Sequence, residues 1–90
     1  MSTLLKQAQA GTIESTDILI MLSPAAEGAG LSVELASPVL KQYGRHIKSM
    51  ICNILQEEGI QDAQVHATDN GALDYTIDAR VRTAIARALA

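Results

Sequence analysis

Residues 31–59, LSVELASPVLKQYGRHIKSMICNILQEEG, change from one hydrophobic period to another and so decide the fold class. Within this stretch, residues 31–36 alternate between apolar and small or polar side chains, as expected of a strand with one buried face. Ser37-Pro38 then favours a helix start, because serine caps free N–H groups and proline suits the first helical position. Up to Gly59 the apolar residues recur at spacings of three and four, which predicts one face of an amphipathic helix: Leu40, Tyr43, Ile47, Met50, Ile51, Ile54 and Leu55.

The chain before this stretch contains a second candidate strand. Residues 18–22 form a short apolar run ended by Ser23-Pro24, and its length favours a strand buried on both faces. The loop at residues 25–30 is rich in glycine and alanine, so we expect the two strands to form an antiparallel hairpin. Residues 1–12 are mostly small and polar, which indicates a frayed helix or a flexible N-terminal tail.

The chain after Gly59 predicts one more strand and one more helix. Residues 61–68 alternate again, and Asp69-Asn70-Gly71 is a typical turn. The last segment begins like a strand near Leu73, but apolar residues recurring every fourth position along its whole length favour a helix: Leu73, Ile77, Val81, Ile85 and Leu89. The order is therefore ββαβα. It predicts a single α+β domain over residues 1–90, a small two-layer sandwich with two helices on one face of the sheet.

The composition argues against a self-contained active site. The chain of 90 residues is 48% hydrophobic but has no Trp or Phe and only Tyr43 and Tyr75 as aromatic residues. Its core must be aliphatic and rich in alanine, whereas small-molecule pockets usually draw on aromatic walls and converging polar groups. We therefore expect a chain without catalytic residues of its own.

Charge and hydropathy exclude several other classes of protein. The net charge of −3 does not favour nucleic-acid binding, which needs a concentrated basic surface. No apolar run approaches the ~20 residues that cross a bilayer, and the N-terminus lacks the basic and apolar regions of a signal peptide. The single cysteine, Cys52, excludes an internal disulfide. These features together predict a cytoplasmic protein.

Few residues offer metal or nucleophile chemistry. His46 and His66 have no acidic neighbours at ligand spacing, so we expect no metal site. Cys52 lies between Ile51 and Asn53 in the second half of the first helix, where packing is its expected role.

Basic residues on the helices have two interpretations. Lys41, Arg45 and Lys48 share the polar side of the first helix, where they form either a solvated face or a docking strip for phosphates or an acidic partner. The same alternatives hold for Arg80 and Arg87 in the last helix.

The polar segment Gly11–Asp17 leads directly into the first apolar strand. Ser15 and Thr16 would hydrogen-bond locally in an exposed connection. Ser15 is also a reasonable acceptor for a phosphate-linked group, and a basic modifying enzyme could bind Glu14 and Asp17 beside it.

This segment carries a family resemblance. Ala10-Gly11-Thr12-Ile13-Glu14-Ser15-Thr16-Asp17 resembles the prosthetic-group attachment motif of the acyl carrier (gamma) subunit of citrate lyase. The similarity continues at residues 41–44, 69–74 and 79–81, and so extends over nearly the whole chain. The Asp-Ser-Leu motif of the fatty-acid carriers is absent.

The resemblance implies a carrier function. Ser15 would hold 2′-(5″-triphosphoribosyl)-3′-dephospho-CoA through a phosphodiester, with acetyl or citryl on its terminal thiol. The implied partners are the alpha (acyl transferase) and beta (citryl lyase) subunits, which cleave citrate to acetate and oxaloacetate, and the prosthetic-group transferase. The charge patterns described above, and not the resemblance, make Glu14, Asp17, Lys41, Arg45 and Lys48 the candidate docking residues.

One departure from the family pattern and several alternatives remain at this point. Thr16 stands where glycine often follows the modified serine, and its hydroxyl is a second attachment candidate. A carrier of the malonate decarboxylase type uses the same kind of cofactor. An unmodified structural or regulatory interaction subunit, or an autonomous enzyme, would leave Ser15 as an ordinary loop residue.

Overall fold

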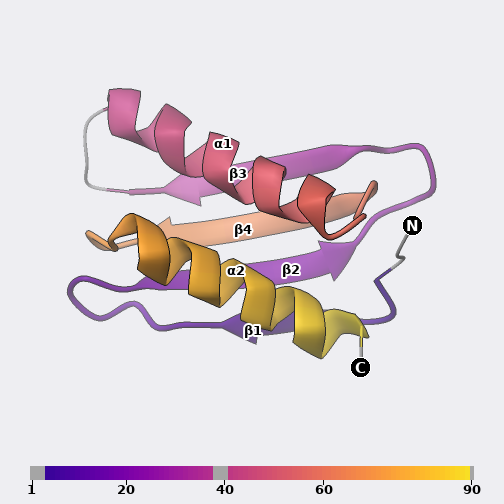
Figure 1. Cartoon of the computed structure of the whole chain (residues 1–90), viewed down its shortest axis with the longest axis horizontal. Coiled ribbons are helices and arrows are strands. Elements are labelled where there is room, and N and C mark those ends of the chain that lie inside the picture. Colours follow the sequence, from indigo (N-terminus) through magenta and orange to yellow (C-terminus); the bar gives the residue numbers. More distant parts are fainter. Residues whose placement is uncertain (1–3, 38–40, 90) are drawn as a thin grey trace.

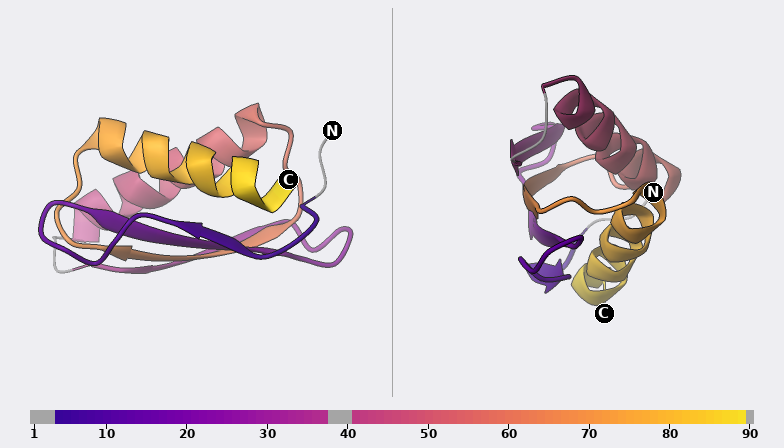
Figure 2. Two further views of the ribbon diagram at one scale, coloured as in Figure 1. Left: turned by 90° about the horizontal axis from the view of Figure 1, so that it is seen from below. Right: turned by 90° about the vertical axis from the view of Figure 1, so that its left-hand side faces the viewer.

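Four strands and two helices form two layers. The structure is a computed structural model that describes residues 4–37 and 41–89, without the side chains of Lys41 and Gln42. The elements are, in order, β1 (Ala8–Ala10), β2 (Ile18–Pro24), β3 (Leu31–Ala36), α1 (Lys41–Glu57), β4 (Ala63–Asp69) and α2 (Asp74–Leu89). Both helices cover the same face of the sheet (Figures 1 and 2). The predicted α+β sandwich is therefore confirmed, with β1 as an additional strand.

The strand order is β1-β2-β4-β3, so the predicted hairpin of β2 and β3 is wrong. β4 lies between them, antiparallel to β2 and parallel to β3. The reason is that α1 connects β3 to β4, and a helical crossover suits parallel neighbours. The apolar positions of β4 are buried under the helices, as a central strand requires: Ala63, Val65 and Ala67.

Only one face of β2 is fully buried, contrary to the sequence prediction. Ile18, Ile20 and Leu22 face the helices and are buried, but Met21 on the opposite face is 46% exposed. Because both helices lie on one side, the other side of the described sheet has no covering layer (Figure 2).

The N-terminal segment packs against the domain, where the sequence indicated a frayed helix or a tail. β1 pairs antiparallel with β2, Ala8 opposite Leu22 and Ala10 opposite Ile20. Leu4 is buried, and the Leu5 N–H donates to the Ala88 carbonyl at 3.0 Å. A three-residue strand of alanine and glutamine has no alternation long enough to be recognised from its sequence.

The helices supply the expected aliphatic core. The fully buried large side chains are Ile47, Ile51 and Leu55 from α1 and Ile77, Val81 and Ile85 from α2. The helical interpretation of the last segment is correct, although Leu73 precedes the first turn and is 55% exposed.

The helix start that Ser37-Pro38 predicts lies at the edge of the described residues and stays a prediction. The described helix begins at Lys41, and the Ser37 hydroxyl donates to Asp69 Oδ2 at 2.9 Å. Pro38 and Leu40 lie outside the described residues, so their predicted roles remain predictions.

The sheet register brings three connections to one end of the molecule. β2 begins at Ile18 opposite Asp69, where β4 ends, and β3 ends beside Thr68. The β1–β2 loop, the β4–α2 loop and the start of α1 therefore share the left-hand end in Figure 1. Neither described helix is long and apolar enough to cross a membrane.

Gly11, at the beginning of the β1–β2 loop, gives a test of this arrangement. Its φ is +94°, and a Cβ there would lie 1.8 Å from the Ile18 carbonyl oxygen, whereas Gly28 has a φ of +86° with open space around it. Gly28→Ala should lower the free energy of unfolding by about 1–2 kcal/mol through backbone strain alone. Gly11→Ala should cost clearly more, roughly 2–4 kcal/mol, because the clash adds to the strain. Urea unfolding followed by circular dichroism measures both, and equal losses would contradict the close approach.

Candidate functional site

Ser15 lies at the tip of a β-turn in the β1–β2 loop. The Asp17 N–H donates to the Glu14 carbonyl at 3.2 Å, which places Ser15 and Thr16 at the two central positions. Thr16 has a φ of +63°, and a type II turn requires positive φ at this position. Glycine is the residue best suited to this conformation. A β-branched residue there is strained by about 1–2 kcal/mol.

Asn70, from the β4–α2 loop, holds this turn from the side. The Thr16 N–H donates to the Asn70 carbonyl at 2.8 Å, and the Asn70 N–H donates to the Asp17 carbonyl at 2.9 Å. The Asn70 side chain also donates to the Ile13 carbonyl at 3.0 Å. The antiparallel pairing of β2 with β4 thus continues beyond the strand ends and orders the turn.

Gly71, which follows Asn70, lies next to the turn that contains Ser15. Its φ is +90°, and a Cβ there would already lie 4.0 Å from the Thr16 Cα. The two sequence motifs that carry most of the family resemblance, around Ser15 and after Asp69, are therefore adjacent in space.

Asp17 is directed into the domain. Arg80 of α2 donates from Nε to Oδ1 and from Nη2 to Oδ2, both at 3.1 Å. The Thr12 hydroxyl donates to Oδ2 and the Ile18 N–H to Oδ1, each at 2.7 Å. The hydrogen bonds from Arg80 and then Thr12 lower the pKa of Asp17 to about 2. The carboxylate is used internally, so its expected docking role has little support from its geometry.

The hydroxyls of Ser15 and Thr16 differ in their surroundings. Thr16 Oγ1 donates to the Ser15 carbonyl at 2.6 Å. Ser15 is exposed, and its Oγ has no hydrogen-bond partner among residues 4–37 and 41–89. A nucleophilic catalyst needs a base within hydrogen-bonding reach, and no such base is described here. Ser15 therefore presents an accessible hydroxyl that no base approaches within hydrogen-bonding distance among the described residues.

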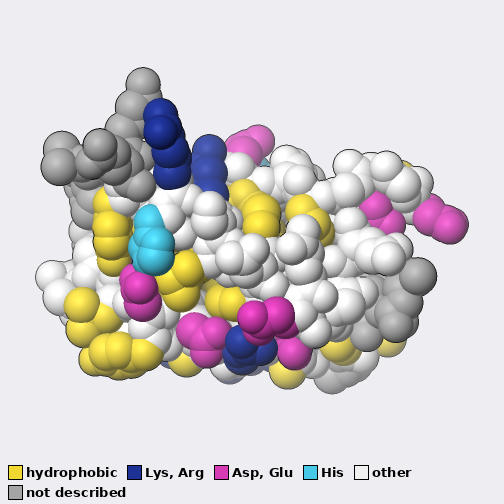
Figure 3. Space-filling model, turned by 45° about the horizontal axis from the view of Figure 1, so that its top comes forward, with side chains coloured by type: hydrophobic (Ala, Val, Ile, Leu, Met, Phe, Trp, Pro, Cys, Tyr) yellow, Lys and Arg dark blue, Asp and Glu magenta, His cyan; other side chains and the backbone are white. Residues whose placement is uncertain are grey.

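The other candidate residues surround this end of the molecule. Glu14 is exposed beside Ser15, and Arg45 and Lys48 are exposed on α1. In the space-filling view, basic side chains lie beside a histidine on the helical face (Figure 3). The side chain of Lys41 lies outside the described residues.

Both histidines have a carboxylate partner that the sequence spacing did not reveal. His46 Nε2 lies 2.9 Å from Asp74 Oδ2, which connects α1 to the start of α2, and His66 Nδ1 lies 3.3 Å from Glu34 Oε2. In the described part of the chain, no three potential ligands are grouped as a metal ion would require. Cys52 is partly buried in α1.

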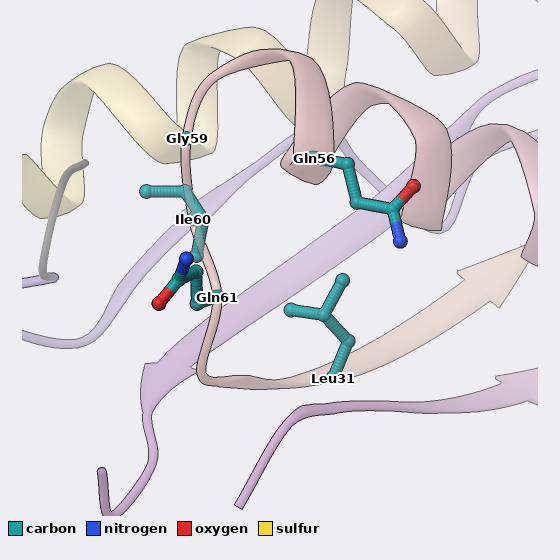
Figure 4. Close-up of a pocket in the computed structure, with 5 residues that line it drawn as sticks. All are labelled: Leu31, Gln56, Gly59, Ile60 and Gln61. Atoms are coloured by element: carbon teal, nitrogen blue, oxygen red, sulfur yellow. The ribbon is translucent and has the colours of Figure 1, made fainter. Parts of the chain in front are cut away.

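A hollow of about 510 Å³ lies at the opposite end of the sheet from Ser15. It is open to solvent, and neutral residues line it: Leu31, Gln56, Gly59, Ile60 and Gln61 (Figure 4). Since the lining contains no charged group or nucleophile, the hollow adds no chemistry to the site.

The sequence indicates Ser15 as a candidate site but does not reveal the residues that order its turn. It predicts only a surface role for Arg80 and a turn at Asn70. The one signal for both was that they belong to the segments of family resemblance in the C-terminal half.

Similarity to a family model and to a solved structure shows which class of protein this chain belongs to. Residues 5–88 match the family model described as ACP: Malonate decarboxylase delta subunit (MdcD). The fold agrees with a chain in the crystal structure of a Pseudomonas malonate decarboxylase hetero-tetramer in complex with malonate. The TM-score is 0.77, with 96% of this chain and 87% of that chain covered, and the identity is 18%. The match and the exposed serine turn define an acyl carrier protein, a carrier and not a catalytic subunit.

More similar relatives identify the particular family. A protein named citrate lyase acyl carrier protein from Halothermothrix orenii is 45% identical over 92% of this chain and 86% of the relative. A protein of the same name from Lacticaseibacillus casei is 49% identical over 90% of this chain and 78% of the relative. A Fusobacterium nucleatum protein of the same name is 40% identical, over 88% of this chain and 83% of the relative. The chain belongs to the citrate lyase acyl carrier protein family.

The ion pair between Asp17 and Arg80 predicts a specific pH dependence. Asp17→Asn should lower the free energy of unfolding by about 1–2 kcal/mol at neutral pH. The pKa of about 2 in the folded chain lies below the ~3.9 of an unfolded aspartate, so this stability is complete above about pH 5 and is lost as the pH falls toward 2.

Urea unfolding at several pH values checks this prediction. The difference between wild type and Asp17→Asn should shrink on acidification, and a difference that stays constant would contradict it. Asp78→Asn is the control, because it removes an exposed ion pair with Arg82 and should change stability by less than about 1 kcal/mol.

Proposed function

We propose that this chain is the acyl carrier subunit of a citrate lyase and that Ser15 is its attachment residue. The observation that carries the assignment is a free, exposed hydroxyl on a turn that Asn70 and Asp17 hold in place. The family supports the carrier role, and the turn geometry supports the choice of residue.

The residues around Ser15 fit a bulky phosphate-linked group. The serine is exposed at the tip of the turn, so a large substituent displaces no buried side chain. The carboxylates near Ser15 also leave little negative charge to repel a phosphate group. Asp17 is neutralised by Arg80, which leaves Glu14 as the exposed acid next to the serine. We assign the prosthetic group as the dephospho-CoA derivative expected from the family.

The group supplies a terminal thiol for the acetyl or citryl cargo, and this chain supplies attachment and presentation. In the attachment reaction, Ser15 Oγ would form the phosphodiester to the innermost phosphorus of the triphosphoribosyl precursor. Pyrophosphate would leave with the electron pair of the broken P–O bond, so the group left on Ser15 would be the phosphoribosyl form of the dephospho-CoA derivative. The hydroxyl proton passes to a base of the modifying enzyme, since no described side chain is placed to accept it.

Three proteins would act on this carrier. The prosthetic-group transferase modifies Ser15, and the alpha and beta subunits then exchange and cleave the acyl cargo. Tethering would raise the local concentration of that cargo at each active site. Arg45 and Lys48, with Lys41, are the proposed docking strip for the catalytic subunits. Arg45 and Lys48 are exposed on α1 and have no ion-pair partner among the described residues. All would work in the cytoplasm.

The malonate decarboxylase type of carrier is the second candidate. The description of the family model and the structural similarity favour it, but that structure is only 18% identical and supports the fold alone. Relatives that are 40–49% identical carry the citrate lyase name, which makes citrate lyase the stronger assignment.

Mass spectrometry of protein produced together with its modifying enzymes tests the attachment residue. Wild type should gain the mass of one prosthetic group, with fragmentation placing it on Ser15, and Ser15→Ala should gain none. Thr16→Ala keeps the Ser15 hydroxyl and should be modified fully, as should Thr16→Gly. A modified Ser15→Ala protein, or a fragment with the group on Thr16, would show that the assignment is wrong.

A further inference from the structure

Exposed apolar side chains gather at the end of the molecule that carries Ser15. Large hydrophobic residues with high exposure among the described residues are Leu5, Ile13, Met21, Leu73 and Tyr75. Ile13 and Leu73 belong to the two loops that Asn70 joins and are 64% and 55% exposed, and Tyr75, in the first turn of α2, is 74% exposed. Figure 3 shows hydrophobic side chains gathered at this end, next to a histidine and acidic groups.

These side chains are attached to an ordered backbone. The Ile13 carbonyl accepts the hydrogen bond from the Asn70 side chain, and the Leu73 carbonyl accepts the N–H groups of Thr76 and Ile77. Tyr75 lies in the first turn of α2, which the buried Ile77 fixes to the core. Because the backbone is already ordered, a partner that covers these side chains orders little chain on binding.

Glu14 gives the same surface a negative charge. Asp17 is paired with Arg80, and Asp74 Oδ2 lies 2.9 Å from His46 Nε2, so both carboxylates have a hydrogen-bonding partner within the domain. Glu14 is exposed and has no ion pair among the described residues. The surface around Ser15 therefore combines three apolar side chains with one uncompensated carboxylate.

We propose that Ile13, Glu14, Leu73 and Tyr75 form the docking surface for the enzyme that attaches the prosthetic group; this inference rests on the proposed function. That enzyme acts on Ser15 Oγ itself, so it must contact the side chains that flank the serine. The catalytic subunits act on the thiol at the far end of the arm and need no such approach.

The charge of the surface fits the same partner. An enzyme that binds a triphosphate precursor needs basic groups near its active site to hold the phosphates. Glu14, one residue before the modified serine, is complementary to that basic site. Apolar contacts from Leu73 and Tyr75 would supply most of the affinity, as buried aromatic and aliphatic anchors do in other interfaces.

Modification kinetics with purified prosthetic-group transferase and its triphosphate precursor test this surface. We expect Leu73→Ser/Tyr75→Ser and Ile13→Ser each to raise the KM for the carrier by about tenfold with little change in kcat, measured by intact mass. Glu14→Gln should raise KM less, with an effect that diminishes at high salt. Leu5→Ser/Met21→Ser is the matched control, because these exposed hydrophobic residues lie elsewhere and their loss should leave KM unchanged.

The outcomes separate this inference from the proposed function. If wild type is modified normally and the variants have unchanged kinetics, the proposed docking surface is wrong but the proposed function stands. If wild type is not modified at all, the proposed function is wrong. Variants modified to completion should support citrate cleavage at the wild-type rate. If they are modified normally but cleave slowly, the surface serves the catalytic subunits instead. If wild type dimerises and the variants do not, a second copy of the chain is the occupant.

Discussion

The bidentate ion pair between Asp17 and Arg80 is the interaction on which the turn around Ser15 depends. It connects the residue that ends the turn to α2, and α2 is fixed to the sheet by its buried aliphatic face. Without that connection, the exposed residues from Thr12 to Thr16 would be held mainly by Asn70. The pair therefore fixes a loop that buries little apolar surface of its own to the ordered core.

The balance of energies explains how Thr16 is tolerated. Its left-handed backbone costs about 1–2 kcal/mol. The three hydrogen bonds of Asn70 each contribute about 0.5–1.5 kcal/mol, and the Asp17 pair adds more. The cross-loop contacts exceed the strain, so the turn keeps its shape without glycine. Thr16 also donates its hydroxyl to the Ser15 carbonyl, whereas the Ser15 hydroxyl has no hydrogen-bond partner among the described residues.

The sequence predicted the elements better than their arrangement. Periodicity identified β3, β4 and both helices, because each has a repeating apolar pattern, and a short apolar run identified β2. It did not reveal that β4 lies between β2 and β3, since strand order depends on which surfaces pack together and not on the pattern within a strand. β1 was missed because three small and polar residues carry no period.

The candidate site, like the fold, was predicted where a local pattern exists and missed where distant residues come together. The motif predicts Ser15 as the attachment residue, which stays a prediction, and the polar composition of Gly11–Asp17 correctly indicated an exposed connection. The contacts of Asn70 and Arg80 with the turn span more than fifty residues of sequence, so no local pattern contains them. The exposure of Leu73 was also hidden, because its spacing from Ile77 suggested a place in the core.

Amide hydrogen exchange in the unmodified protein tests most directly whether the turn is held in place. The N–H groups of Thr16 and Asn70 connect the two loops, so they should exchange almost as slowly as those of β2 and β4. The Ser15 N–H has no described acceptor and should exchange rapidly, as an internal reference. If Thr16 and Asn70 exchange as rapidly as Ser15, the loops are not joined in solution and the account of the site is wrong.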